Sequence, residues 1–458
     1  MMDFITTNLS MFMFIVLAAL FFMGLPVGFV LGGVSLWFGL IGWGLDLFSL
    51  VEFFNFMHRI WGGAADNIVL IAAPLFIFMG ILLEKSEVAA DLLRCLQILL
   101  KRVPGGLALG VAIMGTIMAA TTGIIGASVV MLSMLALPAM LRQNYDKGLA
   151  TGVICAAGTL GILIPPSIML VIMGDIMQLS TGKLFLGAVF PGLLLSALYV
   201  VYIVLLSWWK PHMAPALGSD DDLHEGETLP GLVLKAFVPP TILIGLVLGS
   251  IFLGWATPTE AAGVGVAGAV LLAIMNGKFT PRLMTETVRI STLTIGMVFL
   301  IIMAAACFSY VFRSLGGDDV IHGMLDAMGL GPWGVLLLFL TAIFLMGFFF
   351  DWLEIILIVV PIFAPIIATL DFGTHVAMPS EVVYWFAILI AVNLQTSFLT
   401  PPFGFALFFV KGSAPPSVRM EDIYKGIIPF VLLQLGGLAL TVAFPDLALW
   451  LPRTLMGN

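Results

Sequence analysis

Of the consecutive proline pairs in the chain, Pro165-Pro166 and Pro401-Pro402 stand in the middle of long apolar stretches. Proline has no backbone N–H and its ring clashes with the preceding turn, so no straight helix runs through either pair. Such a break frees carbonyl oxygens that can coordinate a cation and N–H groups that can bind an anion. In a lipid bilayer a break is tolerated only where protein or a water-filled cavity covers it. The two pairs therefore predict two covered sites for ions or small polar solutes.

Hydroxyl, amide and glycine residues are concentrated around both proline pairs. A Na⁺ ion leaves water only where other oxygens replace its hydration shell, and freed carbonyls with neighbouring hydroxyls can do so. We predict that the cation ligands form two sets, each joining a break to a nearby polar or glycine-containing segment. The first set is Thr121, Ser128, Gly158, Thr159 and Ile164, and the second is Gly347, Asp351, Thr396 and Thr400.

A solute anion needs hydrogen-bond donors rather than oxygens. No Lys or Arg lies deep in an apolar segment, so backbone N–H groups at the breaks must bind most of the negative charge. We predict that the solute contacts Thr122, Gly126, Ser128, Pro166, Ser167, Asn393, Gln395 and Pro402. No paired Ser/His or metal-binding cluster lies in the apolar segments, so we predict neither an enzyme nor a covalently bound cofactor.

Several acidic residues in or beside apolar segments have two possible roles. An acid at membrane depth is a functional candidate by default. Asp351, close to Glu354, is either a helix N-cap or a ligand for a cation or proton. Glu260 follows Thr257-Pro258, a spacing that also suits a carboxylate in the first turn of a helix.

The composition restricts the class of protein. Of the 458 residues 61% are hydrophobic and only 10% are charged, with a mean hydropathy of +1.17. A soluble domain carries about 25% charged residues, and the apolar runs here are continuous rather than alternating, which excludes a β-barrel. The sequence therefore predicts an all-α polytopic membrane protein. It contains no nucleotide-binding loop, and nothing in it indicates nucleic-acid binding.

The apolar runs predict about ten transmembrane helices, each of roughly 20 residues, and two re-entrant hairpins. The expected spans are 4–24, 26–42, 67–84, 148–178, 184–209, 236–255, 258–276, 292–312, 382–413 and 423–443, of which 148–178 and 382–413 are broken. The hairpins are expected at 105–141 and 333–369, because each of these runs is too long for one span and has a polar or glycine-containing centre.

The order of these elements predicts two repeats, 1–210 and 232–458, joined by a polar cytoplasmic connector at 211–231. Each repeat contains an amphipathic arm, a hairpin and a broken helix, and the arms are expected at 85–102 and 314–332. The first arm holds four Lys or Arg residues, whereas the second holds three Asp residues and no Lys or Arg. Because basic residues accumulate on the cytoplasmic side, the two arms should lie on opposite sides and the repeats should be inverted. Both termini would then be periplasmic.

Four segments of the sequence resemble the large membrane subunit of tripartite ATP-independent periplasmic (TRAP) transporters, the DctM-like family. These are Pro74–Gly80, Gly158–Ile168, Thr257–Ala262 and Leu399–Gly404, which occur in the family's order across nearly the whole chain. The resemblance implies a multi-pass protein of the bacterial inner membrane that imports an organic acid anion together with Na⁺. It also implies two partners, a small four-helix membrane subunit of the Q type and a periplasmic substrate-binding protein, besides the surrounding membrane lipid.

The same resemblance implies an elevator mechanism, in which the hairpins and broken helices move as one unit against a fixed scaffold. The alternative is a stand-alone anion transporter, or a cation or proton antiporter, built on a similar inverted-repeat fold. Such a protein would need no binding protein, so a transport assay separates the two hypotheses.

Overall fold

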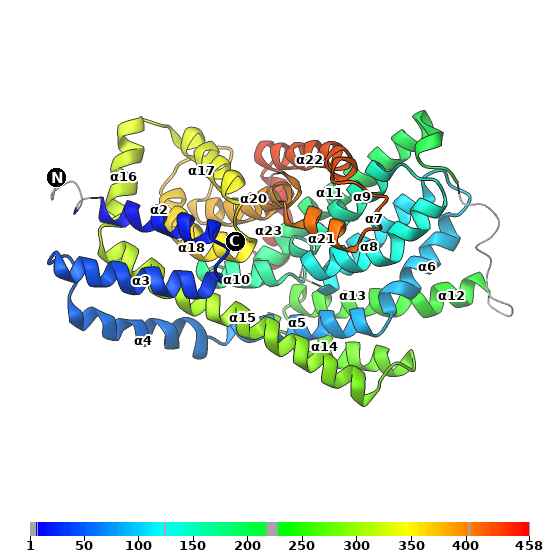
Figure 1. Cartoon of the computed structure of the whole chain (residues 1–458), viewed down its shortest axis with the longest axis horizontal. Coiled ribbons are helices and arrows are strands. Elements are labelled where there is room, and N and C mark those ends of the chain that lie inside the picture. The colour runs from blue at the N-terminus through cyan, green and yellow to red at the C-terminus, as the bar shows by residue number, and fades with distance from the viewer. Residues whose placement is uncertain (1–5, 7, 123–124, 217–227, 402–403, 458) are drawn as a thin grey trace.

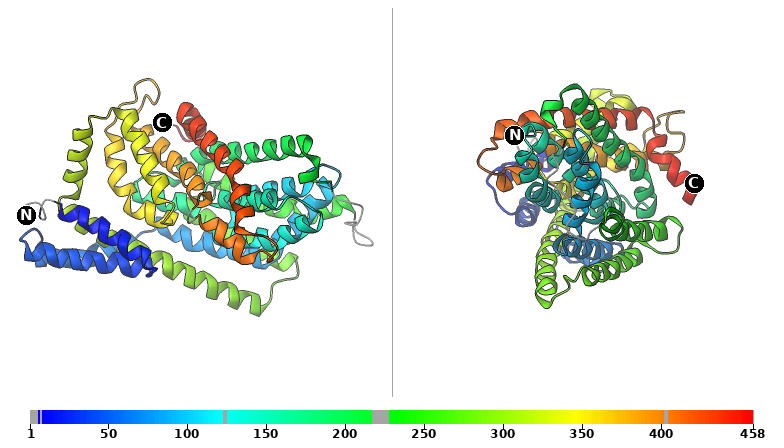
Figure 2. Two further views of the ribbon diagram at one scale, coloured as in Figure 1. Left: turned by 45° about the horizontal axis from the view of Figure 1, so that its top comes forward. Right: turned by 90° about the vertical axis from the view of Figure 1, so that its right-hand side faces the viewer.

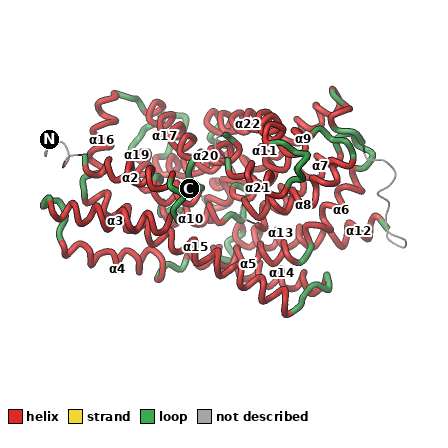
Figure 3. The backbone as a smooth tube through the Cα atoms, in the orientation of Figure 1, coloured by secondary structure: helices red, strands yellow, loops and turns green. Residues whose placement is uncertain are grey.

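The computed structural model describes residues 6, 8–122, 125–216, 228–401 and 404–457. Figure 3 shows helices joined by loops, with no strand among the residues described. Eight helices in this part are long and apolar enough to cross a membrane, and the bent pair Leu50–Ala65 and Val69–Lys85 makes a ninth if it counts as one span. The prediction of an all-helical polytopic membrane protein is confirmed. The number of long spans is lower than ten because apolar helices such as Leu9–Phe22 and Lys147–Ile162 are short.

The first half of the chain forms ten described α-helices and several single turns. The helices are α2 (Leu9–Phe22), α3 (Val27–Gly44), α4 (Phe54–Ile60), α5 (Ala72–Lys85), α6 (Val88–Leu100), α7 (Gly106–Thr122), α8 (Ile125–Arg142), α9 (Lys147–Thr159), α10 (Ile168–Ile176) and α11 (Thr181–Trp209). The turns are η1 (Leu50–Phe53), η2 (Trp61–Ala65), η3 (Val69–Ile71), η4 (Leu160–Ile162) and η5 (Pro211–Met213).

The second half begins after the connector. Its helices are α12 (Leu229–Ala236), α13 (Val238–Phe252), α14 (Pro258–Met275), α15 (Pro281–Ser314), α16 (Gly317–Met328), α17 (Pro332–Met346), α18 (Trp352–Ile358), α19 (Val360–Ala368), α20 (Pro379–Leu399), α21 (Phe405–Ser413), α22 (Met420–Ala443) and α23 (Asp446–Met456).

These bounds match the expected elements except at α4, α12, α15 and α23, and α12 begins inside the predicted connector 211–231. The amphipathic arms are α6 and α16, and the two hairpins are α7 with α8 and α17 with α18 and α19. The sequence did not indicate α4 or α23 as separate helices. α15 has 34 residues and is therefore about 50 Å long, because it starts well before the predicted span 292–312, at a Thr280 side chain that accepts from the Leu283 N–H.

Several contacts between a helix of the first half and a helix of the second have a counterpart in which the matching helices of the two halves are interchanged. α3 of the first half packs against α15 of the second, and α14 of the second packs against α5 of the first. In the same way α9 packs against α22 while α20 packs against α11, and α10 packs against α18 while α21 packs against α8. Each half therefore completes the environment of the other.

The helices form two layers along the long axis of the molecule, and the two arms lie at opposite ends of that axis. In Figure 1, α3, α4, α5, α14 and α15 run along the lower side, and the hairpins and broken helices lie above them; Figure 2 shows the same division. α6 and α12 lie at one end of the long axis and α16 lies at the other end (Figure 1). Among the described helices that are long enough to cross a membrane, α20 is the most enclosed. Of the residues in its apolar stretch 89% are buried, against 28% for the helical stretch that contains α13.

Candidate functional site

The first break is closed by a serine. The Pro165-Pro166 peptide bond is cis, and Ser167 follows it at the N-terminus of α10. The Ser167 hydroxyl donates to the Ile162 carbonyl oxygen before the break and accepts from the Leu170 N–H after it, at 3.4 Å. A hydroxyl has one proton and two lone pairs, so this one side chain satisfies a backbone group on each side of the prolines.

The hairpin helix α8 approaches α9 closely just before the first break. A Cβ atom on Gly158 would lie 2.4 Å from Cγ2 of Val129, so only glycine allows this contact. Ser128 is the residue before Val129 and is buried. Thr159 is also buried, and its hydroxyl donates to a carbonyl oxygen of its own helix at 3.0 Å. The structure therefore brings three members of the first predicted cation set, Ser128, Gly158 and Thr159, to the contact between α8 and α9.

Other predicted residues near the first break have different surroundings. Ile164 faces α11, where a Cβ atom on Gly192 would lie 2.7 Å from its Cγ1. A Cβ atom on Gly126 would lie 2.8 Å from the ring of Phe409 in α21, so the start of α8 touches the helix that follows the second break. Thr121 and Thr122 end α7, and their side chains lie outside the described part of the structure.

A series of hydrogen bonds from side chains to backbone carbonyls runs along the end of α20 to the second break. Thr400 is the extended residue after α20, and its hydroxyl donates to the Thr396 carbonyl oxygen at 2.6 Å. The Thr396 hydroxyl donates to the Asn393 carbonyl oxygen at 2.6 Å, and the Asn393 amide donates to the Leu340 carbonyl oxygen in α17 at 2.7 Å. Each hydroxyl that donates its proton keeps lone pairs that can still coordinate a cation. Pro402 lies outside the described residues.

Gln395 is as buried as its neighbours but differs from them because its side chain has no hydrogen-bond partner among the described residues. Neither its Nε2 nor its Oε1 atom has a hydrogen-bond partner among the residues described. Leaving a buried polar group unpaired costs about 1–3 kcal/mol. Ser397 donates to the Phe344 carbonyl oxygen at 3.3 Å, and a Cβ atom on Gly347 would lie 2.2 Å from Cβ of Ser397. Gly347 therefore lies against α20 beside the second break, as its predicted site requires.

The acidic residues occupy capping positions. Asp351 is the N-cap of α18, and its N–H donates to Oε2 of Glu354 at 2.8 Å. Glu260 accepts from the Thr257 N–H at 2.8 Å, which is the capping arrangement that its spacing suggested. Asp351 thus has the first of its two predicted roles, and its use as a cation ligand stays a prediction.

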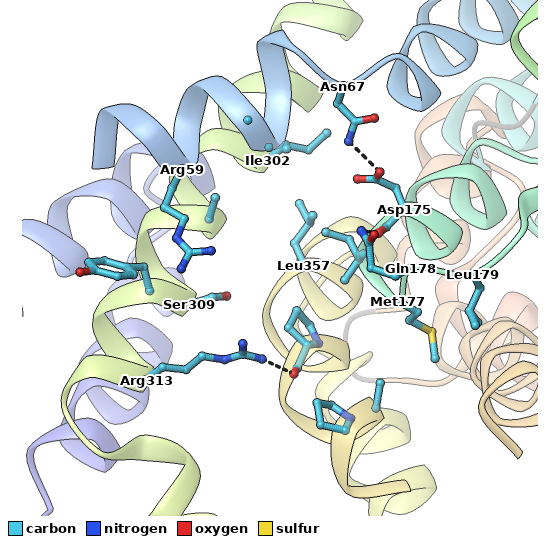
Figure 4. A pocket seen from close by; sticks show the side chains of 18 of the residues that line it. Arg59, Asn67, Asp175, Met177, Gln178, Leu179, Ile302, Ser309, Arg313 and Leu357 are labelled. Carbon is cyan, nitrogen blue, oxygen red and sulfur yellow. Dashed lines mark hydrogen bonds between the residues drawn. The ribbon is translucent and has the colours of Figure 1, made fainter. Parts of the chain in front are cut away.

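A cavity of about 1020 Å³ lies at the C-terminal end of α10, away from both proline pairs. It is bounded by α4 and α15 on one side and by α10, α18, α19 and the start of α20 on the other. Its polar lining includes Arg59, Asn67, Asp175, Arg313 and Tyr384, and it includes no residue that the sequence predicted for the site. Figure 4 shows Arg59 and Arg313 extending into the cavity from one wall, with Asp175 on the opposite wall.

These two arginines are the functional candidates that sequence reasoning missed. Arg59 is the only Lys or Arg in 43–66, and Arg313 follows directly after the predicted span 292–312, so both stood at the edge of an apolar run. The fold turns them inward: Arg313 Nη2 donates to the Pro361 carbonyl oxygen at 2.7 Å, and the Arg59 guanidinium lies 5.3 Å from the centre of the Tyr310 ring. Only the position of α4 and α15 across the cavity from α19 reveals this (Figure 4).

This architecture, with two broken helices among long apolar helices, is that of a polytopic membrane protein. The fold is similar to that of the YdaH transporter of Alcanivorax borkumensis, with a TM-score of 0.61 at 14% identity, covering 86% of this chain and 87% of the other. A second similar fold is that of MtrF from Neisseria gonorrhoeae, with a TM-score of 0.52 at 14% identity over 85% of this chain and 84% of the other.

Sequence comparison identifies the family. The family described as "Tripartite ATP-independent periplasmic transporter, DctM component" matches residues 14–447. The chain is 30% identical to the C4-dicarboxylate TRAP transporter large permease protein of Pseudomonas aeruginosa over 85% of its length and 88% of the relative's. It is 27% identical to the sialic acid TRAP transporter large permease protein of Vibrio cholerae, over 96% and 97% of the two chains. The chain therefore belongs to the DctM family of TRAP transporter large permeases, as its motifs suggested.

Proposed function

We propose that the chain imports an organic acid anion by symport with Na⁺, as the large permease of a three-part system in the bacterial inner membrane. The observation that carries this proposal is the pair of hairpin and broken-helix units, held together by reciprocal contacts such as α10 with α18 and α21 with α8. Two matched helix breaks at the centre of a transporter are where solute and coupling-ion sites lie in inverted-repeat folds.

The two halves act as inverted repeats, 1–210 and 232–458, on either side of the connector 211–231. Reciprocal packing supports this, because a two-fold relation exchanges the neighbours of matching helices, as α3 with α15 and α14 with α5 do. The opposite positions of the oppositely charged arms α6 and α16 support the inversion (Figure 1).

The moving unit of an elevator mechanism consists of the hairpins with the two broken helices. The scaffold consists of α3, α5, α14 and α15, which pack against one another along one side of the molecule (Figure 1). Contacts between the two parts, such as Arg313 with the Pro361 carbonyl oxygen and Asn67 with Asp175, must break during movement.

Na⁺ binds at the two breaks, and the solute binds between them. The buried hydroxyls of Ser128, Thr159 and Thr396 and the partly buried hydroxyl of Thr400 supply oxygens near the breaks. The Gln395 amide, which has no partner among the described residues, supplies both a donor and an acceptor. The contact between α9 and α20 brings the two units close enough to form one central region.

The names of the relatives are the basis for our inference about substrate and partners. The relatives are named as permeases for C4-dicarboxylates, ectoines, sialic acid and 2,3-diketo-L-gulonate, so the family accepts small polar solutes of several kinds. An isethionate permease of Oleidesulfovibrio alaskensis is named DctMQ, and this chain covers 60% of it. We infer that a separate small Q-type subunit and a periplasmic binding protein work with this chain.

The test is uptake into liposomes that contain the chain and its small subunit, with a binding protein outside and an imposed Na⁺ gradient. We expect uptake of the solute carried by the binding protein only when Na⁺ is higher outside. Uptake that ignores the Na⁺ gradient would overturn the coupling, and uptake without any binding protein would favour the stand-alone transporter instead.

A further inference from the structure

We propose that the cavity between α4, α15 and α19 is an outer anion-binding site, separate from the helix breaks, in which Arg59 and Arg313 bind a carboxylate group of the solute. This inference rests on the proposed function, because it assigns the cavity to the same solute before that solute reaches the breaks. At about 1020 Å³ the cavity has room for a small organic acid with its water.

Arg59 supplies a positive charge without a counter-charge. Among the residues described it makes no salt bridge, and its guanidinium lies over the Tyr310 ring. The ring is held in place because the Tyr310 hydroxyl donates to Glu52 at 3.2 Å and accepts from Asn55 at 2.7 Å. Stacking on a fixed ring orients the guanidinium and leaves its N–H donors free to bind an anion.

Arg313 keeps donors available in spite of two contacts. Its Nη2 atom donates to the Pro361 carbonyl oxygen at 2.7 Å, and its Nε atom lies 3.6 Å from Oδ2 of Asp318. The side chains of both members of that ion pair are nearly half exposed, at 46% and 48%, and such pairs hold each other weakly. A guanidinium has five donors, so Arg313 can bind a carboxylate without losing its contact with Pro361.

Charges on the opposite wall do not cancel the arginines. The lining of the described cavity contains one carboxylate, that of Asp175, which accepts from the Asn67 amide at 2.6 Å. The lining itself therefore carries two arginines and one aspartate, while Asp318, the partner of Arg313, lies outside the lining. A concave surface concentrates the field of such lining charges. His58 also lines the cavity beside Arg59.

The cavity lies on the side from which an imported solute would arrive. It is lined by the last turns of α15, the end that is followed by the acidic arm α16. The opposite end of α15 carries Arg282 and Arg289, which the charge pattern assigns to the cytoplasm. Arg59 and Arg313 are thus positive charges on the same side as the acidic arm α16, and they favour capture of an anion there.

The first experiment measures the charge of the cavity with a cysteine reporter. Ser309 lines the cavity, so the Ser309→Cys variant of the reconstituted transporter is treated with an anionic and a cationic methanethiosulfonate reagent of similar size. We expect the anionic reagent to react faster, and Arg59→Gln to reduce the ratio of the two rates roughly tenfold, because one unit charge acts on both reagents with opposite sign. The three native cysteines are buried, and the parent protein measures their background.

Matched variants separate charge from structure. Arg59→Lys keeps the charge and should keep the ratio, and Arg289→Gln removes an arginine from α15 outside the cavity and should leave it unchanged. Arg313→Gln should also lower the ratio. If that variant fails to fold, Arg59→Gln decides alone, since Arg59 donates no hydrogen bond among the described residues that its loss would break.

The second experiment measures binding, with succinate and lactate as the probes. Either anion at millimolar concentration should slow the reaction of Ser309→Cys with neutral N-ethylmaleimide, and this protection should be lost in Arg59→Gln. The outer site would be overturned if neither arginine variant changed the ratio of the two reagent rates. It would also be overturned if protection survived Arg59→Gln, or if neither anion gave protection. If the parent protein showed no Na⁺-driven uptake but kept its ratio of anionic to cationic reagent rates, only the proposed function would be contradicted.

Discussion

The two helix breaks share a proline pair and differ in how their polar groups are satisfied. At the first break the Ser167 hydroxyl bridges the Ile162 carbonyl and the Leu170 N–H, so the backbone on both sides is paired within the break itself. At the second break Thr400 bonds back to its own helix, and the neighbouring Gln395 amide is buried without a partner among the described residues. One side chain thus pairs a backbone group on each side of the first break, whereas near the second break the Gln395 amide keeps its donor and acceptor unused among the described residues.

This difference assigns the two breaks unequal roles. An unpaired amide inside a membrane protein lowers stability, so its presence indicates a gain elsewhere, such as binding of an ion or a solute. A paired N-cap such as Ser167 needs no further partner to be stable. We therefore expect substitutions near the second break to reduce transport and substitutions at the first break to reduce stability.

The largest effect is expected for Gln395→Leu, which replaces the unpaired amide with an apolar side chain of similar length. Uptake driven by Na⁺ should fall at least about tenfold, while thermal stability stays equal or rises because a penalty of about 1–3 kcal/mol is removed. Gln434 is a matched control, since it is a fully buried glutamine in α22 whose amide donates to the Tyr199 hydroxyl. Gln434→Leu should retain uptake per folded molecule; equal uptake in both variants would show that Gln395 is a packing residue.

A smaller effect is expected for Thr400→Ala, which removes a hydroxyl next to the second proline pair. The Na⁺ concentration for half-maximal uptake should rise roughly fivefold, because one ligand worth about 1 kcal/mol is lost. Ser128→Ala at the first hairpin should have a weaker effect in the same direction. Thr400→Ser keeps the hydroxyl and should behave like the parent protein, and unchanged Na⁺ dependence in both alanine variants would refute the predicted cation sites.

The smallest effect on transport is expected for Ser167→Ala. Loss of the N-cap should lower the free energy of unfolding by about 1 kcal/mol, while uptake per folded molecule changes less than about twofold, the effect of roughly 0.4 kcal/mol. Thermal unfolding of the purified protein and uptake normalised to folded protein measure the two quantities. A large loss of normalised uptake would return Ser167 to the solute site, where the sequence predicts it.

Much of the fold was predictable because apolar length and proline position are local properties. Helices fill the segments predicted as arms and hairpins, and both helix breaks fall at the proline pairs. The re-entrant nature of 105–141 and 333–369 stays a prediction. α4 and α23 were not predictable as separate helices, because they are short and follow long apolar runs. The length of α15 was also missed, because its first turns, with Arg282 and Arg289, are too polar to look like a span.

The candidate site was predictable only in part. Ser128, Gly158, Thr159, Thr396 and Thr400 all lie beside a break or at a hairpin contact, because each is close in sequence to the feature that makes the site. The close approaches of Gly158 to Val129 and of Gly347 to Ser397 depend on residues far apart in the chain. Such contacts have no local signal in a single sequence.

The sequence by itself determined that this is a helical membrane protein with two broken helices, since hydrophobicity and the geometry of proline act locally. Its motifs also determined the TRAP large permease family. Only the tertiary structure decided that Arg59 and Arg313 share a cavity and that Gln395 is buried without a described partner. Each of these depends on which distant helices pack together, and packing is decided by the whole fold rather than by neighbouring residues.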